Sequence, residues 1–139
     1  MSTKETINPA EAPVLEKTKS LGIKKIEGQE FYIVGVNHTR GQPTKFSEGS
    51  KGEDGKVDYY TIKIETPVEL EFKDEGKIPI NNFFINKFAY NQLEKIPNAI
   101  ERINNGLTRL GPCKSVLRDS NKTDGYKYRC LAFERDPDY

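Results

Sequence analysis

The order of the secondary-structure elements constrains this chain more than any single motif. Apolar and polar residues alternate with a period of two over residues 57–65 and 68–73, and strand-type sequence also covers residues 23–38, 114–120 and 126–134. Between these segments, apolar residues recur at helical spacing at Ala89, Leu93, Ile96, Ile100, Ile103 and Leu107. The sequence therefore predicts three strands, one long helix and two further strands, in that order.

Individual residues indicate where these elements bend, begin or end. Gly28 and Gly35 are candidates for a bulge or a sharp bend in the long first strand. Asn86 is a suitable N-cap for the helix, and Pro97 predicts a kink or a restart within it. Gly106, with the two asparagines before it, predicts the end of the helix.

The connections between the strands are also informative. The dipeptide Thr66-Pro67 predicts the end of the second strand, and residues 78–85 leave open a further short strand after the third. Residues 39–56 form a predicted loop rich in Gly and Lys, of a length typical of functional or disordered loops. Phe46 is the one aromatic residue of this loop, and it either packs onto the domain or contacts a ligand.

This order of elements resembles the OB-fold, a five-stranded Greek-key barrel with its helix after the third strand. The resemblance covers element order only, and it implies an OB-like barrel of order β-β-β-α-β-β over residues 22–135. Barrels of this type bind oligonucleotides on the face of strands two and three and on the 1–2 and 4–5 loops. Because one fold hosts many functions, the functional step is an analogy. Residues 1–21 are poor in large apolar side chains and are predicted to be a flexible tail.

Aromatic residues interleaved with basic ones indicate a ligand class. The formal net charge is only +1, but basic residues outnumber acidic ones between residues 109 and 133. Single-strand binders stack bases on aromatic rings within a positive groove, although tyrosine also occurs in strands for packing alone. The sequence thus predicts a non-enzymatic single-stranded nucleic-acid-binding protein, with DNA favoured over RNA and no cofactor. Its predicted binding residues are Arg40, Lys45, Phe46, Tyr59, Lys63, Lys122, Tyr126, Lys127, Tyr128 and Arg129.

Two other functions remain open. One is a β-rich subunit of a larger assembly, with Phe46 and its loop as contacts. The other is a Mg²⁺-dependent nuclease, because Asp58 followed by Glu71 and Lys73 resembles the metal site of restriction-endonuclease-like nucleases. Val57 stands where that family usually has Pro, and alternation on an exposed strand explains the same residues without function.

The remaining features concern the cell compartment and the C-terminus. Cys113 and Cys130 fall on the last two strands and are predicted to be buried thiols rather than a disulfide. No apolar run reaches the roughly 18 residues that a membrane span needs, and no signal-type segment is present. We therefore expect a cytoplasmic protein without membrane association. Residues 136–139 form an acidic tip similar to the partner-recruiting tails of bacterial single-stranded-DNA-binding proteins. Those tails end in Phe and lack the Arg135 and Tyr139 found here, and an ordinary hydrophilic terminus explains this segment without a partner.

Overall fold

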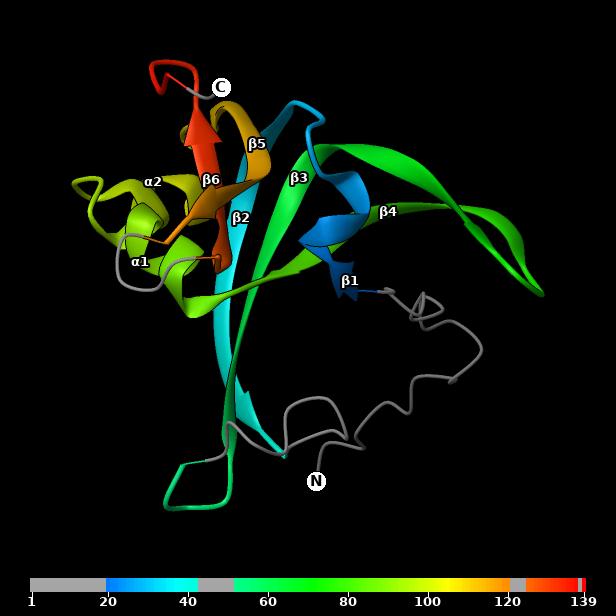
Figure 1. The fold of residues 1–139 in the computed structure, drawn as a ribbon, viewed down its shortest axis with the longest axis horizontal. Helices are drawn as coiled ribbons and strands as arrows, with labels where there is room; N and C mark the ends of the chain where they lie inside the picture. Colours follow the sequence, from blue (N-terminus) through cyan, green and yellow to red (C-terminus); the bar gives the residue numbers. More distant parts are fainter. Residues whose placement is uncertain (1–19, 43–51, 121–124, 138) are drawn as a thin grey trace, which may run out of the picture.

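The computed structural model describes residues 20–42, 52–120, 125–137 and 139 (Figure 1). The elements of the first half are β1 (Ser20–Gly22), the 3-10 helix η2 (Ile23–Ile26), β2 (Phe31–Gly41), β3 (Val57–Phe72) and β4 (Gly76–Ile85). The helices α1 (Lys87–Glu94) and α2 (Ala99–Asn104) follow, and then the strands β5 (Leu110–Asp119) and β6 (Lys127–Phe133). The described part of the chain is therefore mostly β-structure.

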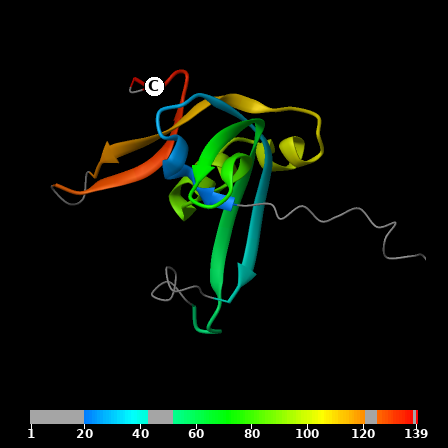
Figure 2. The same ribbon diagram turned by 90° about the vertical axis from the view of Figure 1, so that its right-hand side faces the viewer.

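The strands form one curled sheet in the order β1-β4-β3-β2-β5-β6. The strands β2, β3 and β4 are antiparallel neighbours, and the chain then returns through both helices to place β5 beside β2. This is Greek-key connectivity, because the fourth strand lies next to the first of three consecutive strands. Figure 2 shows the β5–β6 hairpin turned away from the long β2–β3 ladder, which gives the sheet the shape of a half-barrel.

The core lies on the concave side of this sheet. Side chains of β3 enter it at Tyr60, Ile62 and Ile64, while Tyr59 and Lys63 point to the opposite face, as the period-two pattern predicts. The helices close the core with side chains on one stripe. The largest completely or almost completely buried side chains are Phe83, Ile26, Ile33, Ile62, Ile64, Leu93, Ile103 and Leu131.

The predicted helix is interrupted where Pro97 indicates a kink or restart. Its N-cap is Asn86, whose side-chain oxygen accepts a hydrogen bond from the backbone N–H of Ala89 at 2.7 Å. The first segment, α1, ends before the proline, and Asn98 adopts a left-handed conformation with φ 57° just before α2. The helical stripe therefore belongs to two short helices, and Gly106 follows the second with φ 74°.

The first predicted strand begins later than expected. Residues Ile23–Ile26 form the 3-10 helix η2, in which Ile23 and Ile26 face the same way and are both buried. Gly28 then takes φ 79°, and β2 starts at Phe31. Two residues of the predicted tail, Ser20 and Leu21, belong to β1, which pairs in parallel with β4. The rest of that tail lies outside the described residues.

The prediction that Thr66-Pro67 ends a strand is wrong. The strand β3 runs through both residues, and the third strand of the meander is β4. Pro67 is tolerated because the β3–β4 register shifts between Lys63 and Val68, so that the proline occupies an irregular position where no ladder hydrogen bond is required. With β1 included, the described sheet has six strands rather than the predicted five.

The helix η2 lies across the concave side of the sheet. It contacts both β4 and β5, which the strands β3 and β2 separate in the sheet. The loop after it is tied to β5, because the backbone N–H of Gly28 donates to the carbonyl oxygen of Ser115 at 3.0 Å. The buried side chain of Ile26 thus joins the two halves of the curled sheet.

The outer edge of β6 is covered by α1 instead of by another strand. The backbone N–H of Leu131 donates to Gln92 Oε1 at 2.9 Å, and Gln92 Nε2 donates back to the carbonyl oxygen of Leu131 at 3.0 Å. At the N-cap of the same helix, Asn86 Nδ2 donates to the carbonyl oxygen of Arg129 at 2.7 Å. These amides fix α1 against the last strand.

Both cysteines are buried and neither forms a disulfide, in agreement with the sequence prediction. In the β5–β6 ladder Cys113 lies opposite Phe133 and Cys130 lies opposite Val116, so the two thiols are not cross-strand partners. Burial raises the pKa of the Cys113 thiol to about 12, which keeps it protonated at neutral pH.

Candidate nucleic-acid interface

The outer face of β3 and β4 carries aromatic and basic side chains side by side. Residues directly opposite in the ladder share a face, and the register places Phe84 opposite Thr61 and Asn82 opposite Lys63. Tyr59 lies on the same face of β3, with its ring 6.2 Å from that of Phe84 and tilted by 55°. Phe84 is 40% exposed although it is a large apolar residue. The face therefore combines accessible rings with an exposed lysine.

The tyrosine of this face is held in place by the start of the predicted loop. Its hydroxyl donates a hydrogen bond to the carbonyl oxygen of Gln42 at 2.6 Å. Gln42 directly follows β2, whereas Tyr59 is in β3, so the bond crosses the loop end of the β2–β3 hairpin. A ring fixed at its hydroxyl end loses little rotational freedom when a flat ligand stacks on it.

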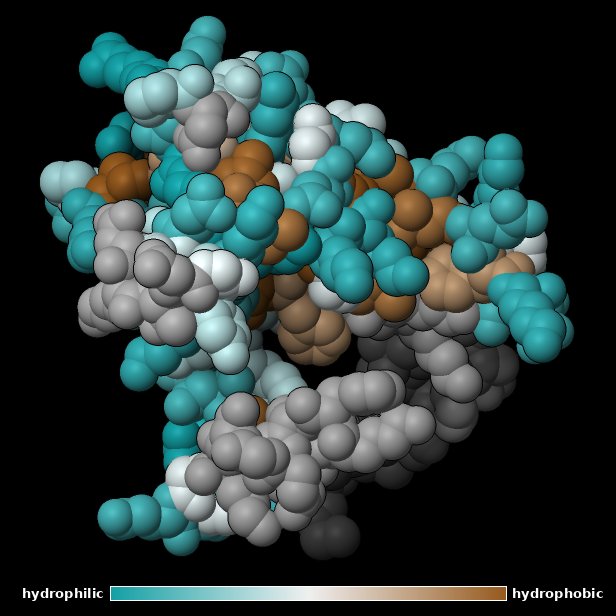
Figure 3. Space-filling model, in the orientation of Figure 1, coloured by the Kyte–Doolittle hydropathy of each residue, from teal (hydrophilic) through white to brown (hydrophobic). Residues whose placement is uncertain are grey.

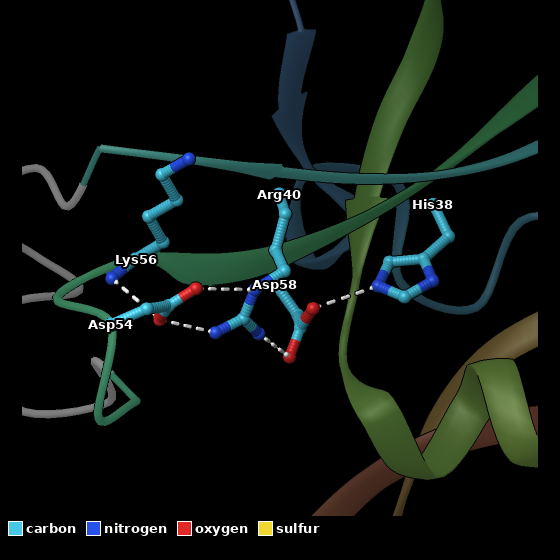
Figure 4. Close-up of polar contacts among 5 residues, drawn as sticks. All are labelled: His38, Arg40, Asp54, Lys56 and Asp58. Carbon is cyan, nitrogen blue, oxygen red and sulfur yellow. Dashed lines mark hydrogen bonds and ion pairs between the residues drawn. The ribbon is translucent and has the colours of Figure 1, made fainter.

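A polar network occupies the same loop end of the hairpin (Figure 4). The guanidinium of Arg40 lies between two carboxylates, with Nη2 2.5 Å from Asp54 Oδ1 and Nη1 2.9 Å from Asp58 Oδ2. His38 Nε2 donates to the other oxygen of Asp58 at 2.9 Å. The backbone N–H of Lys56 donates to Asp54 at 3.1 Å and completes the network.

This network removes Arg40 from the set of free positive charges. Its hydrogen bonds to Asp54 and Asp58 raise the pKa of the Arg40 guanidinium, and those to Arg40 lower the pKa of Asp54. The pKa of Asp58 is lowered by its hydrogen bonds to His38 and then to Arg40. The structure places the Arg40 guanidinium between two carboxylates, and its predicted part in nucleic-acid binding stays a prediction.

Aromatic stacking continues the network into the core. The ring of His38 stacks on Tyr60 with centroids 4.6 Å apart, and Tyr60 contacts Tyr90 of α1 at 4.5 Å. Burial, followed by the nearby charge of Asp58, raises the pKa of the Tyr60 hydroxyl. The loop end of the β2–β3 hairpin is thus attached to α1 by stacked rings.

The predicted binding residues of the last strand divide into two groups. Tyr126 is 67% exposed and Lys127 is also exposed, while the half-buried Tyr128 contacts the ring of Phe88 edge-on at 5.0 Å. Arg129 instead has only 19% of its side chain exposed, and its Nη1 lies 3.0 Å from Glu27 Oε1. Arg129 therefore holds β6 to the loop after η2, and its role in ligand binding stays a prediction.

The basic character of the C-terminal third is largely compensated. Arg109 pairs with Glu65, Arg118 pairs with Asp136 at 3.1 Å, and Arg129 pairs with Glu27. These acidic partners come from other elements, so the excess of basic residues along the sequence does not become an equal excess in space. Lysines such as Lys63 and Lys127 are the better candidates for phosphate contacts, since both are exposed.

The residues of the nuclease hypothesis are not brought together. Asp58 is the second residue of β3 and Glu71 the second-last, so roughly 40 Å of strand separates them. Asp58 lies opposite Arg40, whereas Glu71 lies opposite Lys77 at the far end of the β3–β4 ladder. Within the described ranges, no group of three or more His, Cys, Asp or Glu side chains is arranged to hold a metal ion.

The acidic tip folds back onto the domain. Asp136 Oδ2 accepts hydrogen bonds from the backbone N–H of Phe133 at 2.8 Å and from Arg118 at 3.1 Å. The Tyr139 hydroxyl donates to the Glu30 carboxylate, and Lys114 Nζ lies 4.2 Å from the centroid of the Tyr139 ring. A protein partner at this tip stays a prediction, and such a partner would compete with these contacts.

Three predicted residues, Lys45, Phe46 and Lys122, lie outside the described residues. Conversely, sequence reasoning missed Phe84 and Phe88. Phe84 could have been found only by assigning residues 76–85 to a regular strand, in which it points outward with Asn82. Phe88 gave a clearer signal, because it is a large apolar residue in the helix that does not belong to the buried stripe of Ala89 and Leu93.

The comparisons with known proteins found no matching family model and no significant match among curated proteins or solved structures. The helices of the described segments are all too short to cross a lipid bilayer.

Proposed function

We propose that the protein binds single-stranded nucleic acid, with DNA as the first ligand to test, on the outer face of β3 and β4. The observation that carries this proposal is the ring pair of Tyr59 and Phe84, 6.2 Å apart on an exposed sheet face that also presents Lys63. Unstacked bases can lie against such rings, each contact contributing about 1–3 kcal/mol, while a lysine neutralises phosphate. A duplex keeps its bases stacked internally and cannot use these rings.

The connectivity of the sheet supports the same proposal. The strands β2 to β6 have Greek-key order with the helices after the third of them, and we interpret this as an open relative of the OB-type barrel. In such barrels the face of strands two and three binds oligonucleotides, and these strands correspond to β3 and β4 here. The binding face expected by analogy is therefore the face on which the two rings lie.

We propose a smaller set of binding residues for this function than the sequence predicted. We retain Tyr59 and Lys63, add Phe84, and assign Arg40 and Arg129 to structural ion pairs. Tyr126, Lys127 and Tyr128 lie on another hairpin and form a separate group. The contributions of Lys45, Phe46 and Lys122 stay predictions from the sequence.

The test is fluorescence anisotropy with a labelled thymidine dodecamer over a salt series. Tyr59→Ala and Phe84→Ala should each weaken binding by about 1–3 kcal/mol. Tyr59→Phe is the matched control, because it keeps the ring and removes the hydroxyl that donates to Gln42. Lys63→Ala should reduce the salt slope by about 1, whereas Lys77→Ala at the far end of β4 should leave it unchanged.

Two results would count against the proposal. The first is an absence of binding to any single strand at low salt by the folded protein. The second is equal loss of affinity in Lys63→Ala and Lys77→Ala with no effect of Tyr59→Ala, which would indicate unspecific attraction between charges. Circular dichroism of each variant ensures that the comparison is made between folded molecules.

A subunit of a larger assembly is the second candidate function. Beyond the register shift, β4 is the only strand among the described residues that pairs with β3, and this two-stranded arm projects from the domain (Figure 1). One of its faces carries the half-buried Val68, Leu70 and Ile78, and hydrophobic residues are visible along the arm (Figure 3). If this candidate is correct, light scattering should show concentration-dependent association that Leu70→Lys abolishes without loss of folding.

A further inference from the structure

A second pair of aromatic rings lies near the first one. Phe88 of α1 and Tyr128 of β6 make an edge-on contact, with centroids 5.0 Å apart and an interplanar angle of 64°. Phe88 is 49% exposed, and Tyr126, two residues before Tyr128, is 67% exposed. Two accessible aromatic residues and a partly accessible one thus gather on a surface that the proposed β3–β4 site does not include.

These rings are not required by the hydrophobic core. The buried residues of α1 are Ala89 and Leu93, and Phe88 is not among them. In β6, Leu131 points into the core, and Tyr128 lies three residues away and therefore on the opposite face of the strand. Both rings therefore lie outside the buried core cluster, as Tyr59 and Phe84 do, although Cys130 and Ala132 on the same face of β6 as Tyr128 are buried.

The two ring pairs flank one short junction of the chain. Phe84 is near the end of β4 and Phe88 is in the first turn of α1, so at most about 14 Å of chain separates them. Between them, Asn86 donates to the carbonyl oxygen of Arg129 at 2.7 Å and so holds β6 beside this junction. The neighbour of Arg129 in the sequence is Tyr128, which places the second pair immediately beyond the first.

Charge favours a polyanion over an apolar protein surface at this place. Lys87 precedes Phe88 and Lys127 precedes Tyr128, and both lysines are exposed. Asp119 lies opposite Lys127 in the ladder and offsets part of this charge. Rings alternating with lysines over a short distance are the combination that a single strand uses, through stacked bases and neutralised phosphates.

We propose that Phe88 and Tyr128 form a second stacking site for the same single strand that lies on Tyr59 and Phe84. The inference rests on the proposed function and extends it, since it defines the ligand as a strand long enough to reach both pairs. At roughly 3.4 Å per nucleotide for a stacked strand, 14 Å corresponds to about four nucleotides. Strands of three nucleotides reach one pair, whereas strands of more than about four nucleotides can reach both.

The experiment uses tryptophan as a reporter, because the chain contains none. Phe88→Trp and Phe84→Trp each place one indole at one of the ring pairs. Leu117→Trp is the matched control: Leu117 is 46% exposed on the β5–β6 hairpin, but it lies opposite Arg129 and thus on the other face from Tyr128. Each variant is titrated with thymidine oligomers of three, four, six, eight and twelve nucleotides.

The proposal expects the dodecamer to quench the fluorescence of Phe88→Trp and Phe84→Trp but not that of Leu117→Trp. In anisotropy, the affinity of the wild-type protein should rise steeply between three and eight nucleotides. Phe88→Ala should remove most of this rise, weakening dodecamer binding by about fivefold to a hundredfold. Because Phe88 is half exposed, this variant should fold, and Phe88→Trp provides an independent readout if it does not.

The outcomes separate this inference from the proposed function. Quenching of Phe84→Trp without quenching of Phe88→Trp, together with unchanged dodecamer affinity in Phe88→Ala, overturns the second site and leaves the first. Quenching of Leu117→Trp equal to that of Phe88→Trp also overturns it, because contact would then be unspecific. No quenching and no binding in any variant overturns the proposed function itself.

Discussion

Replacing Ile26 by alanine tests whether η2 joins the two halves of the curled sheet. The side chain of Ile26 is completely buried, and η2 contacts both β4 and β5. The substitution removes three carbon atoms, which corresponds to about 2.4 kcal/mol of lost transfer free energy at about 0.8 kcal/mol per methylene. The cavity left behind should increase the loss to about 3–5 kcal/mol, against a total stability of about 5–15 kcal/mol for a domain of ordinary size.

Urea unfolding followed by circular dichroism measures this loss as a lower midpoint with an unchanged slope. Ile26→Val should cost only about 0.5–1.5 kcal/mol. Lys25→Ala is the matched control, because Lys25 is exposed in the same turn and its truncation creates no cavity. The reasoning is refuted if Ile26→Ala and Lys25→Ala agree within about 0.5 kcal/mol, since η2 would then lie outside the cooperatively folding core.

Three further predictions concern other parts of the structure. Asp58→Asn removes the negative charge of Asp58 and one of the two oxygens that accept from His38 and Arg40. Because the pKa of Asp58 is lowered in the folded state, its contribution is present above the ordinary value of about 4 and disappears as the pH falls through the lowered pKa. The melting temperatures of wild type and Asp58→Asn should therefore differ at pH 7 and converge in acid once Asp58 is protonated in the folded protein, and a difference that stays constant as the pH falls would contradict the assignment. Gly111→Ala should destabilise the protein by about 1–3 kcal/mol in urea, because an added Cβ would lie 2.8 Å from the backbone oxygen of Phe31 and 2.6 Å from the Tyr32 ring; Gly22→Ala, where the added atom meets nothing within 4 Å, is its control. Gln92→Leu should cost about 1–3 kcal/mol by leaving the Leu131 peptide groups without partners, and no difference from Lys95→Ala in the same assay would show that water replaces the amide equally well.

The parity of β3, the cap of α1 and the break between the two helices could be predicted because they depend on local chemistry. Asn86 caps a helix through its own side chain, and a proline such as Pro97 interrupts a helix because it has no backbone N–H to donate. Alternation over Tyr59 to Lys63 fixes which side of β3 faces the core, whatever the neighbouring strands are. These signals do not require knowledge of distant residues.

The parts that could not be predicted depend on contacts between distant residues. Pro67 reads as a strand break, and only the register shift opposite β4 makes it acceptable within β3. The charges of Arg40 and Arg129 appear available in the sequence, but Asp54, Asp58 and Glu27 compensate them after folding. The exposed position of Phe84 likewise depends on the pairing of β4 with β3. A candidate binding residue can thus be recognised by type from the sequence, whereas its freedom to bind depends on the fold.

The amide of Gln92 has a consequence for how molecules of this protein meet one another. An uncovered strand edge can recruit an extended segment of a second molecule, and repetition of that step leads to fibres. At Leu131 the Gln92 side chain occupies both the donor and the acceptor that such a segment would need. The opposite end of the described sheet is β1, a strand of three residues that offers little length for pairing. Pairing between molecules is therefore disfavoured at these two outermost strands of the described sheet.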